Sequence, residues 1–431
     1  MATIAAPAAP IAERQPTDWT TPAMQARIAA RYRAERNFRR LGAAALVIAA
    51  SFLAFLLFTI VRDGWTGFQR TEARIDVHYD AATLGLGPNP TPAQLARADY
   101  QALLLKAAEQ LGPADDTLSD AAWLELRDAL IENPALLGQK ATLWVPVRSS
   151  IDLLAKGKFD LAAPAESRGV SDREVADWRW LDGKGLLRTG FNSTFLLGAD
   201  STEPELAGIG GAALGSLLTL IVTIAIAFPL GVFSAVWLEE FAPKGRLADI
   251  IELSINNLAA VPSIIFGLLG LAFFLNFAGL PRSAPLVGGI TLALMIMPVI
   301  VIAARVAIKA VPPSIRDAAL GIGASRIQVV FHHVLPLALP GIMTGTIIGV
   351  ARALGETAPL LLIGMRAFVT DVPQGFTAPA TVLPMQVFLW SDDVQRGFVE
   401  KTSAAIIVLM LVLIAMNSLA IYLRNRFERR W

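Results

Sequence analysis

Two opposite charges, Arg352 and Glu356, lie inside the long apolar stretch 337–364. Their spacing of four residues places both side chains on one face of a helix. A charge in a membrane helix costs about 2.5 to 3.5 kcal/mol on insertion scales, and such residues usually face a bundle interior or a water-filled cavity. A guanidinium offers a planar fork of donors to a tetrahedral oxyanion, and a carboxylate can hold that fork when the site is empty. The pair therefore predicts an anion path, or else a salt bridge that only locks the helix.

A third charge, Arg305, lies near one end of the apolar stretch 283–308. It is either a second residue of the same path or a basic anchor at the membrane surface. The absence of Cys excludes disulfides and thiolate metal sites, and the net charge of +1 gives no reason to expect nucleic acid as a partner. The three His form no recognisable metal site. No Gly-rich phosphate loop is present, so we expect no cofactor on this chain, and any ATP must be bound by another chain.

Membrane helices must position these charges, because 54% of the residues are hydrophobic and only 17% are charged. Leu41 to Val61 is a run of 21 uncharged residues, about 30 Å as a helix, which matches one bilayer and favours an uncleaved anchor over a signal peptide. Five further apolar runs lie at 209–238, 253–280, 283–308, 337–364 and 402–423. Together with Leu41 to Val61 they predict an all-α polytopic membrane protein with six transmembrane helices. Prolines inside the spans predict kinks, at Pro229, Pro262, Pro298 and Pro359.

Basic residues mark the cytoplasmic side of a membrane protein. Residues 1–40 contain seven Arg and residues 424–431 contain four, and Lys244, Arg246, Lys309, Arg316 and Arg326 lie in two loops that fall on the same side if there are six spans. This pattern predicts six segments: a cytoplasmic basic tail (1–40), a transmembrane helix (41–61), an insertion outside the membrane (62–207), a core of five spans (208–423), within it a cytoplasmic loop (309–336), and a cytoplasmic tail (424–431).

The insertion 62–207 has charges of both signs and no run long enough to cross a bilayer. Residues 71–79 and 141–147 are typical of strands, whereas residues 92–111, 118–131 and 171–180 are typical of helices. These patterns predict a small α+β module. It contains no catalytic constellation, so we expect it to be dispensable for the transport chemistry, and a deletion joining Gly64 to Gly208 to assemble.

A short polar stretch precedes the fifth span. Asp317-Ala318-Ala319 is followed by Gly323, and Leu335-Pro336 begins twelve residues later. This spacing resembles the signature loop of ABC importer permeases, in which Glu is usual at the position of Asp317 and Ile at that of His333. The resemblance implies a small helix that docks on a cytoplasmic ATPase; the alternative is a solvated helix-turn-helix between two spans. The residues that it implies transmit the ATPase motion are Asp317, Ala318, Ala319, Gly323, Leu335 and Pro336.

Two further motifs narrow the resemblance. Residues 351–360, Ala-Arg-Ala-Leu-Gly-Glu-Thr-Ala-Pro-Leu, and residues 257–267, Asn-Leu-Ala-Ala-Val-Pro-Ser-Ile-Ile-Phe-Gly, resemble span motifs of the phosphate-specific ABC importer permeases. The second of these is closer to the PstA subunit than to its partner PstC. The resemblance covers residues 209–423 and implies the type I ABC importer permease fold, multi-pass in the bacterial inner membrane and in contact with lipid. It also implies three partners: a PstC-type permease, a PstB-type ATPase dimer that uses ATP and Mg, and a periplasmic PstS-type phosphate-binding protein.

Other functions stay open at this point. The chain could be a permease for another oxyanion. An ATP-independent channel or secondary transporter could also use Arg352 and Glu356, but it would have no need of the loop 315–336. A membrane-anchored sensor would need a signalling domain inside the cell, where only short tails are expected.

Overall fold

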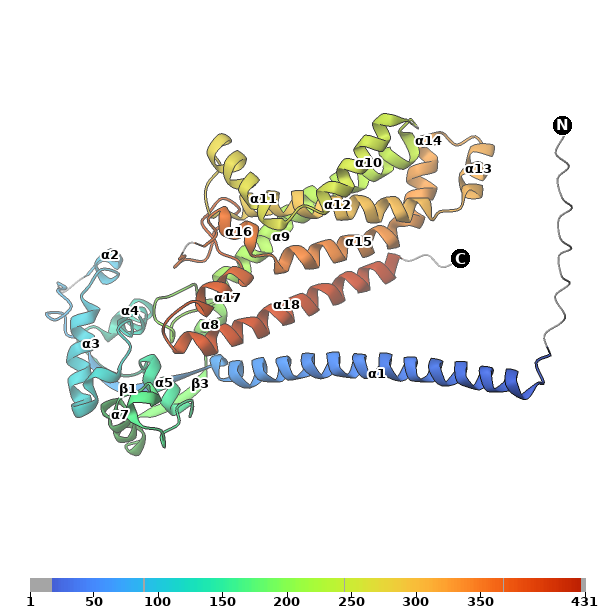
Figure 1. Ribbon diagram of the computed structural model, residues 1–431. Coiled ribbons are helices and arrows are strands. Elements are labelled where there is room, and N and C mark those ends of the chain that lie inside the picture. The colour runs from blue at the N-terminus through green and yellow to red at the C-terminus, as the bar shows by residue number, and fades with distance from the viewer. Residues whose placement is uncertain (1–17, 88–89, 244, 367, 428–431) are drawn as a thin grey trace, which may run out of the picture. The chain divides into compact units, whose positions relative to one another are not determined.

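The computed structural model describes residues 18–427 except 88–89, 244 and 367, so Lys244, the first part of the N-terminal tail and the last arginines lie outside the described residues. The chain divides into two compact units, one up to Thr59 and one from Ile60 onward. Figure 1 shows that the second unit combines long helices with a small mixed module.

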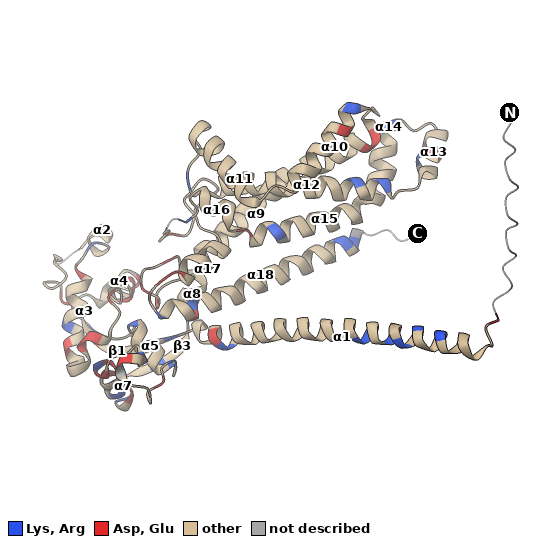
Figure 2. Cartoon of the chain, in the orientation of Figure 1, with Lys and Arg blue, Asp and Glu red and all other residues tan. Residues whose placement is uncertain are grey.

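From Pro22 onward, the first unit is part of a single helix. Helix α1 runs from Pro22 to Gly64, so the predicted basic segment and the predicted first span are one element. Six of its seven arginines lie in the first half, an uncharged stretch follows, and Arg62 lies in the last turn (Figure 2).

Five helices of the described chain are long and apolar enough to cross a membrane, namely Pro22–Phe68, Gly210–Phe241, Pro285–Lys309, Arg326–Gly355 and Gly397–Arg426. A sixth span exists only if the pair Arg246–Ala259 and Ser263–Phe277 is counted as one. The helical elements are α9 (Gly210–Val236) with the π-helical segment η4 (Trp237–Phe241), α10 (Arg246–Ala259), α11 (Ser263–Leu269) with the π-helical η5 (Gly270–Phe277), α12 (Pro285–Lys309), α13 (Pro313–Gly321), α14 (Arg326–Gln328), the π-helical η6 (Val329–Val334), α15 (Leu335–Gly355), α16 (Ala358–Leu362), α17 (Leu383–Ser391) and α18 (Gly397–Phe427).

The predicted span 253–280 is interrupted at Pro262, where we predict a kink, but it forms two helices instead of one kinked helix. Helices α10 and α11 meet at an angle of 102°, with Pro262 as the residue immediately before α11. Proline lacks the N–H that a continuous helix needs and disfavours helical geometry in the residue before it. By contrast, α9 continues through Pro229 and α12 continues through Pro298.

Glycines allow α12 and α15 to approach closely. A Cβ atom on Gly341 would lie 2.7 Å from the Cβ of Ala307, and one on Gly345 would lie 2.0 Å from the Cβ of Ala303. Small residues at a spacing of four are the usual means by which membrane helices bring their backbones together. The two helices therefore pack closely against each other, and α9 packs on α12 as well.

The insertion contains a three-stranded antiparallel sheet in the order β2-β1-β3, with β1 at Gln69–His78, β2 at Lys140–Pro146 and β3 at Leu187–Phe191. Strand β1 buries alternate residues, from Thr71 through Val77, against the helices. These helical elements are η1 (Trp65–Phe68), α2 (Pro92–Leu95), α3 (Tyr100–Ala108), η2 (Glu109–Thr117), α4 (Trp123–Glu132), η3 (Pro134–Leu136), α5 (Ser149–Ala155), α6 (Ala165–Arg168), α7 (Asp172–Gly183) and α8 (Ser193–Leu197). The predicted strands 71–79 and 141–147 correspond to β1 and β2, and the predicted helices 118–131 and 171–180 correspond to α4 and α7. The predicted helix 92–111 is divided into α2, α3 and the start of η2, whereas β3, α5, α6 and α8 were not predicted.

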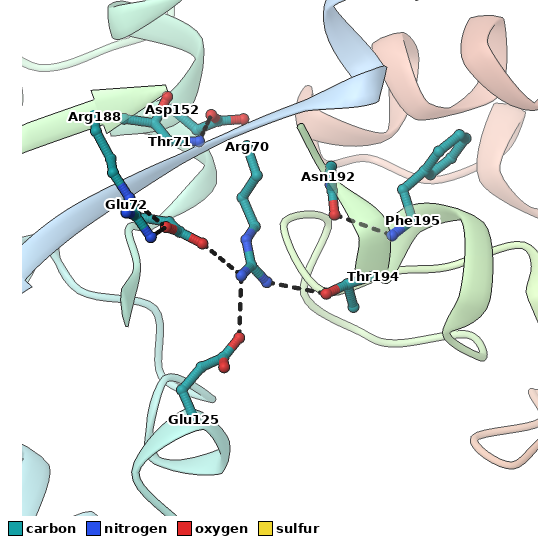
Figure 3. A network of polar contacts seen from close by, with 9 residues as sticks. All are labelled: Arg70, Thr71, Glu72, Glu125, Asp152, Arg188, Asn192, Thr194 and Phe195. Atoms are coloured by element: carbon teal, nitrogen blue, oxygen red, sulfur yellow. Dashed lines mark hydrogen bonds and ion pairs between the residues drawn. The ribbon is translucent and has the colours of Figure 1, made fainter. Parts of the chain in front are cut away.

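Arg70 of β1 ties the sheet to its surroundings. Its Nη2 atom lies 2.6 Å from Glu72 and 3.1 Å from Glu125 of α4, and its Nη1 atom donates to the Thr194 hydroxyl of α8 at 3.2 Å (Figure 3). Since α8 leads directly into α9, this contact joins the sheet to the start of a membrane helix.

A buried ion network joins the insertion to α18. The Lys156 ammonium lies 2.6 Å from Asp152 and 2.6 Å from Glu400 of α18, and each of these side chains is at most 5% exposed. The Lys401 ammonium donates to the backbone carbonyl of Gly67 at 3.3 Å. When an ion pair is buried, removal of one partner leaves the other charge desolvated, which strongly destabilises the fold. The insertion and α18 are therefore one structural body.

An apolar cluster spans the same junction. It combines residues on both sides of it, Phe68, Phe195, Ala207, Trp390, Phe398 and Ala404. A shared core of this kind argues against the expectation that the insertion is a dispensable module.

Candidate functional site

Arg352 and Glu356 are in contact, as the spacing predicts. The Nε atom of Arg352 lies 3.4 Å from Oε1 of Glu356, and the two side chains are 46% and 18% exposed. This is a single long ion pair, and the terminal nitrogens of Arg352 make no hydrogen bond to any described residue. The planar end of the guanidinium is therefore available to another ligand.

The helix around this pair differs from the prediction. Helix α15 ends at Gly355, Glu356 is extended with ψ of 128°, and α16 begins at Ala358. Pro359 therefore lies in the first turn of a new helix, where its missing N–H costs nothing, instead of kinking one long span. The interruption predicted at Pro359 divides the predicted span 337–364 into two helices, because in one continuous helix Pro359 would clash with the carbonyl of Gly355.

The pair of Arg352 and Glu356 nevertheless adjoins residues that pack inside the helix bundle. Its neighbours Ala353 and Leu354 line a small cavity together with Thr219 of α9 and Leu292 of α12. Leu292 lies about 10 Å along α12 from Pro285, at 1.5 Å per residue. The cavity holds about 10 Å³, room for one water molecule at most. This cavity is too small for an oxyanion.

The two span motifs meet in the structure. A Cβ atom on Gly267, the last residue of the motif 257–267, would lie 2.7 Å from the Cα of Pro359 in the motif 351–360. Glycine at this position lets α11 pack directly on α16, one turn after Glu356. The broken helix pair thus supports the chain segment that carries the charged pair.

Arg305 is held by two carboxylates instead of facing an open path. Its Nε atom lies 2.5 Å from Glu239 of η4, and its Nη2 atom lies 2.7 Å from Glu252 of α10. The side chain is 10% exposed. Arg305 is therefore apart from the pair Arg352–Glu356 and engaged with other helices in this conformation.

The predicted coupling loop forms a small helix and a turn. Asp317 and Ala318 are exposed on α13, whereas Ala319 is 4% exposed and packs into the bundle core. Gly323 follows in the turn with φ of +91°, a conformation that favours glycine. Leu335 and Pro336 are half-buried at the start of α15.

Exposed apolar side chains flank this turn and were not predicted. Leu320 is 47% exposed, Ile322 is 84% exposed and Ile327 is 62% exposed. Their exposure on a short loop between membrane helices is what a protein-docking surface would present. The sequence offers no local signal for it, because isolated Leu and Ile residues are also common in cores.

Two family models match the chain. Residues 227–431 match the family described as "Binding-protein-dependent transport system inner membrane component". Residues 25–165 match a family described as "Domain of unknown function (DUF3333)", which begins in α1 and ends in the insertion.

Curated relatives decide the family. The chain is 31% identical over 231 residues to "Phosphate transport system permease protein PstA 1" of Mycobacterium tuberculosis (strain CDC 1551 / Oshkosh), which covers 53% of this chain and 74% of that protein. The chain belongs to the PstA-type ABC transporter permeases. Two other relatives of this PstA-type permease are "Probable ABC transporter permease protein YqgI" of Bacillus subtilis (strain 168), 29% identical over 62% of this chain and 93% of that protein, and PstA of Yersinia pestis, 28% identical over 49% of this chain and 71% of that protein.

Among solved structures, the inward-facing MetNI methionine ABC transporter is similar to this PstA-type permease at 18% identity. It covers 50% of this chain and 95% of that one, with a TM-score of 0.41. The family and the apolar helices make the chain a multi-pass inner-membrane protein with the role of a permease subunit.

Proposed function

We propose that this PstA-type permease is the transmembrane subunit of an ATP-driven importer of inorganic phosphate. The names of its relatives support phosphate as the substrate. The observation that carries the proposal is Arg352, a half-exposed arginine at the end of a membrane helix, with one long contact to Glu356. Its free fork of donors suits a tetrahedral oxyanion.

The path is proposed to lie between this chain and a second permease. A charged side chain that is 46% exposed cannot face lipid without a large cost, so it must face water or another protein. The cavity beside Ala353 is far too small for phosphate. A shared path satisfies both observations and also disfavours an ATP-independent channel or secondary transporter built from this chain alone.

The partners follow from this assignment. A second permease of PstC type would complete the path, an ATPase dimer of PstB type that uses ATP and Mg would dock at α13, and a binding protein of PstS type would deliver phosphate from outside. Asp317, Ala318, Ala319, Gly323, Leu335 and Pro336 would carry the ATPase motion into α15. The arginine-rich start of α1 and the basic end of α18 favour cytoplasmic termini.

Variants of the charged pair test the proposal in the reconstituted complex. Arg352→Gln should abolish phosphate uptake while the complex still assembles, because the anion loses its donors. Arg352→Lys keeps the charge but loses the planar fork, and should retain only part of the activity. Glu356→Gln should hold the anion longer and slow turnover more than initial binding. Arg366→Gln, which removes an exposed arginine outside α15, is the matched control and should transport normally.

The double variant Arg352→Gln with Glu356→Gln separates an anion site from a helix lock. Two neutral amides can replace a structural ion pair, so restored uptake would contradict the site assignment. Competition by arsenate and sulfate measures selectivity in the same assay. Inhibition by sulfate as strong as that by arsenate would favour a permease for another oxyanion.

A further inference from the structure

Two adjacent glutamates form the end of the helix that begins with α9. Glu239 and Glu240 lie in the π-helical segment η4, and each contacts a different arginine. Glu239 holds Arg305 of α12 at 2.5 Å, and Glu240 holds Arg316 of α13 at 2.8 Å.

Arg316 makes more contacts than a surface ion pair requires. Its Nε and Nη2 atoms donate to Oε1 of Glu240 at 3.1 Å and 2.8 Å. Its Nη1 donates to the carbonyl of Val311 at 2.6 Å, and its Nη2 also donates to the carbonyl of Ile308 at 2.9 Å. Carbonyls in the last turn of a helix lack partners within it, and Ile308 lies in the last turn of α12. Arg316 therefore binds the end of α12 and the end of η4 at once.

These contacts are largely shielded from water. The side chains of Glu240 and Arg316 are 13% and 22% exposed, and those of Glu239 and Arg305 are 11% and 10% exposed. Removing one partner of such a pair leaves the other charge desolvated, which is costly. By contrast, the Lys309 ammonium lies 3.4 Å from Glu239 with 59% of its side chain exposed, so it adds little.

We propose that Arg316 is a positioning residue that transmits the movement of α13 to α9 through Glu240. This inference rests on the proposed function, because it requires that α13 docks on an ATPase. Arg316 directly precedes Asp317 of the predicted coupling motif, so a displacement of α13 moves the guanidinium. The backbone connects α13 to α12 on one side and, through α14 and η6, to α15 on the other, whereas the pair with Glu240 adds a direct link to η4 and so to α9.

Loss of the ion pair between Arg316 and Glu240 should uncouple ATP hydrolysis from phosphate import. In proteoliposomes with the full complex and binding protein, Arg316→Gln should raise the ATP hydrolysed per phosphate imported by roughly fivefold or more, the lower end of couplings between sites. Glu240→Gln should raise it less, because an amide oxygen still accepts from Arg316. Arg316→Lys should lie between wild type and Arg316→Gln. Lys309→Gln is the matched control in the same cluster and should keep the wild-type ratio.

A cross-link tests the link without its charges. The chain contains no Cys, so the double variant Glu240→Cys with Arg316→Cys can be labelled selectively. Without a cross-linker it should hydrolyse ATP with little import, and bridging by a short bismaleimide should restore import. Restored import would show that transport needs the link between positions 240 and 316, and not only a correctly folded loop.

The outcomes are distinguishable. A wild-type complex that imports no phosphate would overturn the proposed function and the present inference with it. A wild-type complex that imports phosphate, together with an unchanged ratio in Arg316→Gln, would overturn only the inference. The same holds if bridging leaves import as low as in the unbridged double variant.

Discussion

Glu205 is a buried carboxyl group that neither transport nor coupling accounts for. It is 2% exposed, and neither of its oxygens has a hydrogen-bond partner among the described residues. Burial raises the pKa of Glu205 to about 7 despite the nearby Ser119 hydroxyl, and the carboxylates of Glu203 and Asp152 act in the same direction as burial. The group therefore holds its proton up to neutral pH.

This shift makes stability depend on pH. Because the folded pKa lies above the unfolded value of 4.5, the contribution of Glu205 is complete below that value and is lost as the pH rises through about 7. The loss is on the order of 3 kcal/mol. We expect Glu205→Gln to raise the thermal unfolding midpoint of the purified protein at pH 8 and to change it little at pH 5. Glu109→Gln, at an exposed position of the insertion, is the control and should follow the wild type at both values. A variant at position 205 with an unaltered pH profile would contradict the buried, protonated state.

Residue spacing predicts local pairs and misses distant ones. The contact between Arg352 and Glu356 follows from a separation of four residues. Arg305 could not be assigned in the same way, because its carboxylates lie 66 and 53 residues away along the chain. Only the packing of α10 and η4 against α12 brings them together.

At the scale of elements, we expect the glycines at the contact between α12 and α15 to tolerate substitution by a larger residue least. In Gly345→Ala the new Cβ atom would meet the Cβ of Ala303 at 2.0 Å, so α15 must move away from α12. Overpacking of this kind costs about 1 to 3 kcal/mol. We expect a lower unfolding midpoint in detergent and less monodisperse protein. Gly355→Ala makes the same change on the same helix where no atom lies within 4 Å, and should fold normally. Equal stability of the two variants would show that α12 and α15 are not in direct contact.

Hydropathy finds membrane helices but does not say where they break. Pro298 lies in the helix whose apolar window is 61% buried, and the helix continues through it. Pro262 follows α10, which has no buried residue in this chain, and there the chain bends by 102°. Burial against neighbours can offset a lost hydrogen bond, and a sequence window contains no information on those neighbours. The apolar runs and the prolines inside them were therefore predictable. Which of these prolines break the helix was not: the breaks lie at Pro262 and Pro359, and the helices continue through Pro229 and Pro298.

At the scale of the whole molecule, the insertion is expected to be required for assembly. A deletion joining Gly64 to Gly208 would remove Phe68 and Phe195 from the apolar cluster that contains Trp390. It would also remove Lys156 and leave Glu400 without that counter-charge. We expect the deletion variant to accumulate poorly in the membrane and to aggregate on extraction, as measured by size-exclusion chromatography. A monodisperse, transporting deletion variant would restore the view of a dispensable module.

The sequence contains no sign of this junction. Glu400 and Lys401 look like ordinary flanking charges before the predicted span 402–423. Their partner Lys156 lies 244 residues from Glu400, in a module with a different composition. The α+β character of the insertion was predictable from strand and helix periodicity. Its attachment was not, because buried ion pairs between distant segments are decided by tertiary packing.

The ion pair between Lys156 of the insertion and Glu400 lies at the first turn of α18, a helix of 31 residues. Such a helix is a stiff rod about 46 Å long. If the insertion rotated by about five degrees with this helix fixed in it, the far end of the helix would move by about 4 Å. A protein that bound the insertion and rotated it on one side of the membrane would then displace the C-terminal end of α18 on the other side.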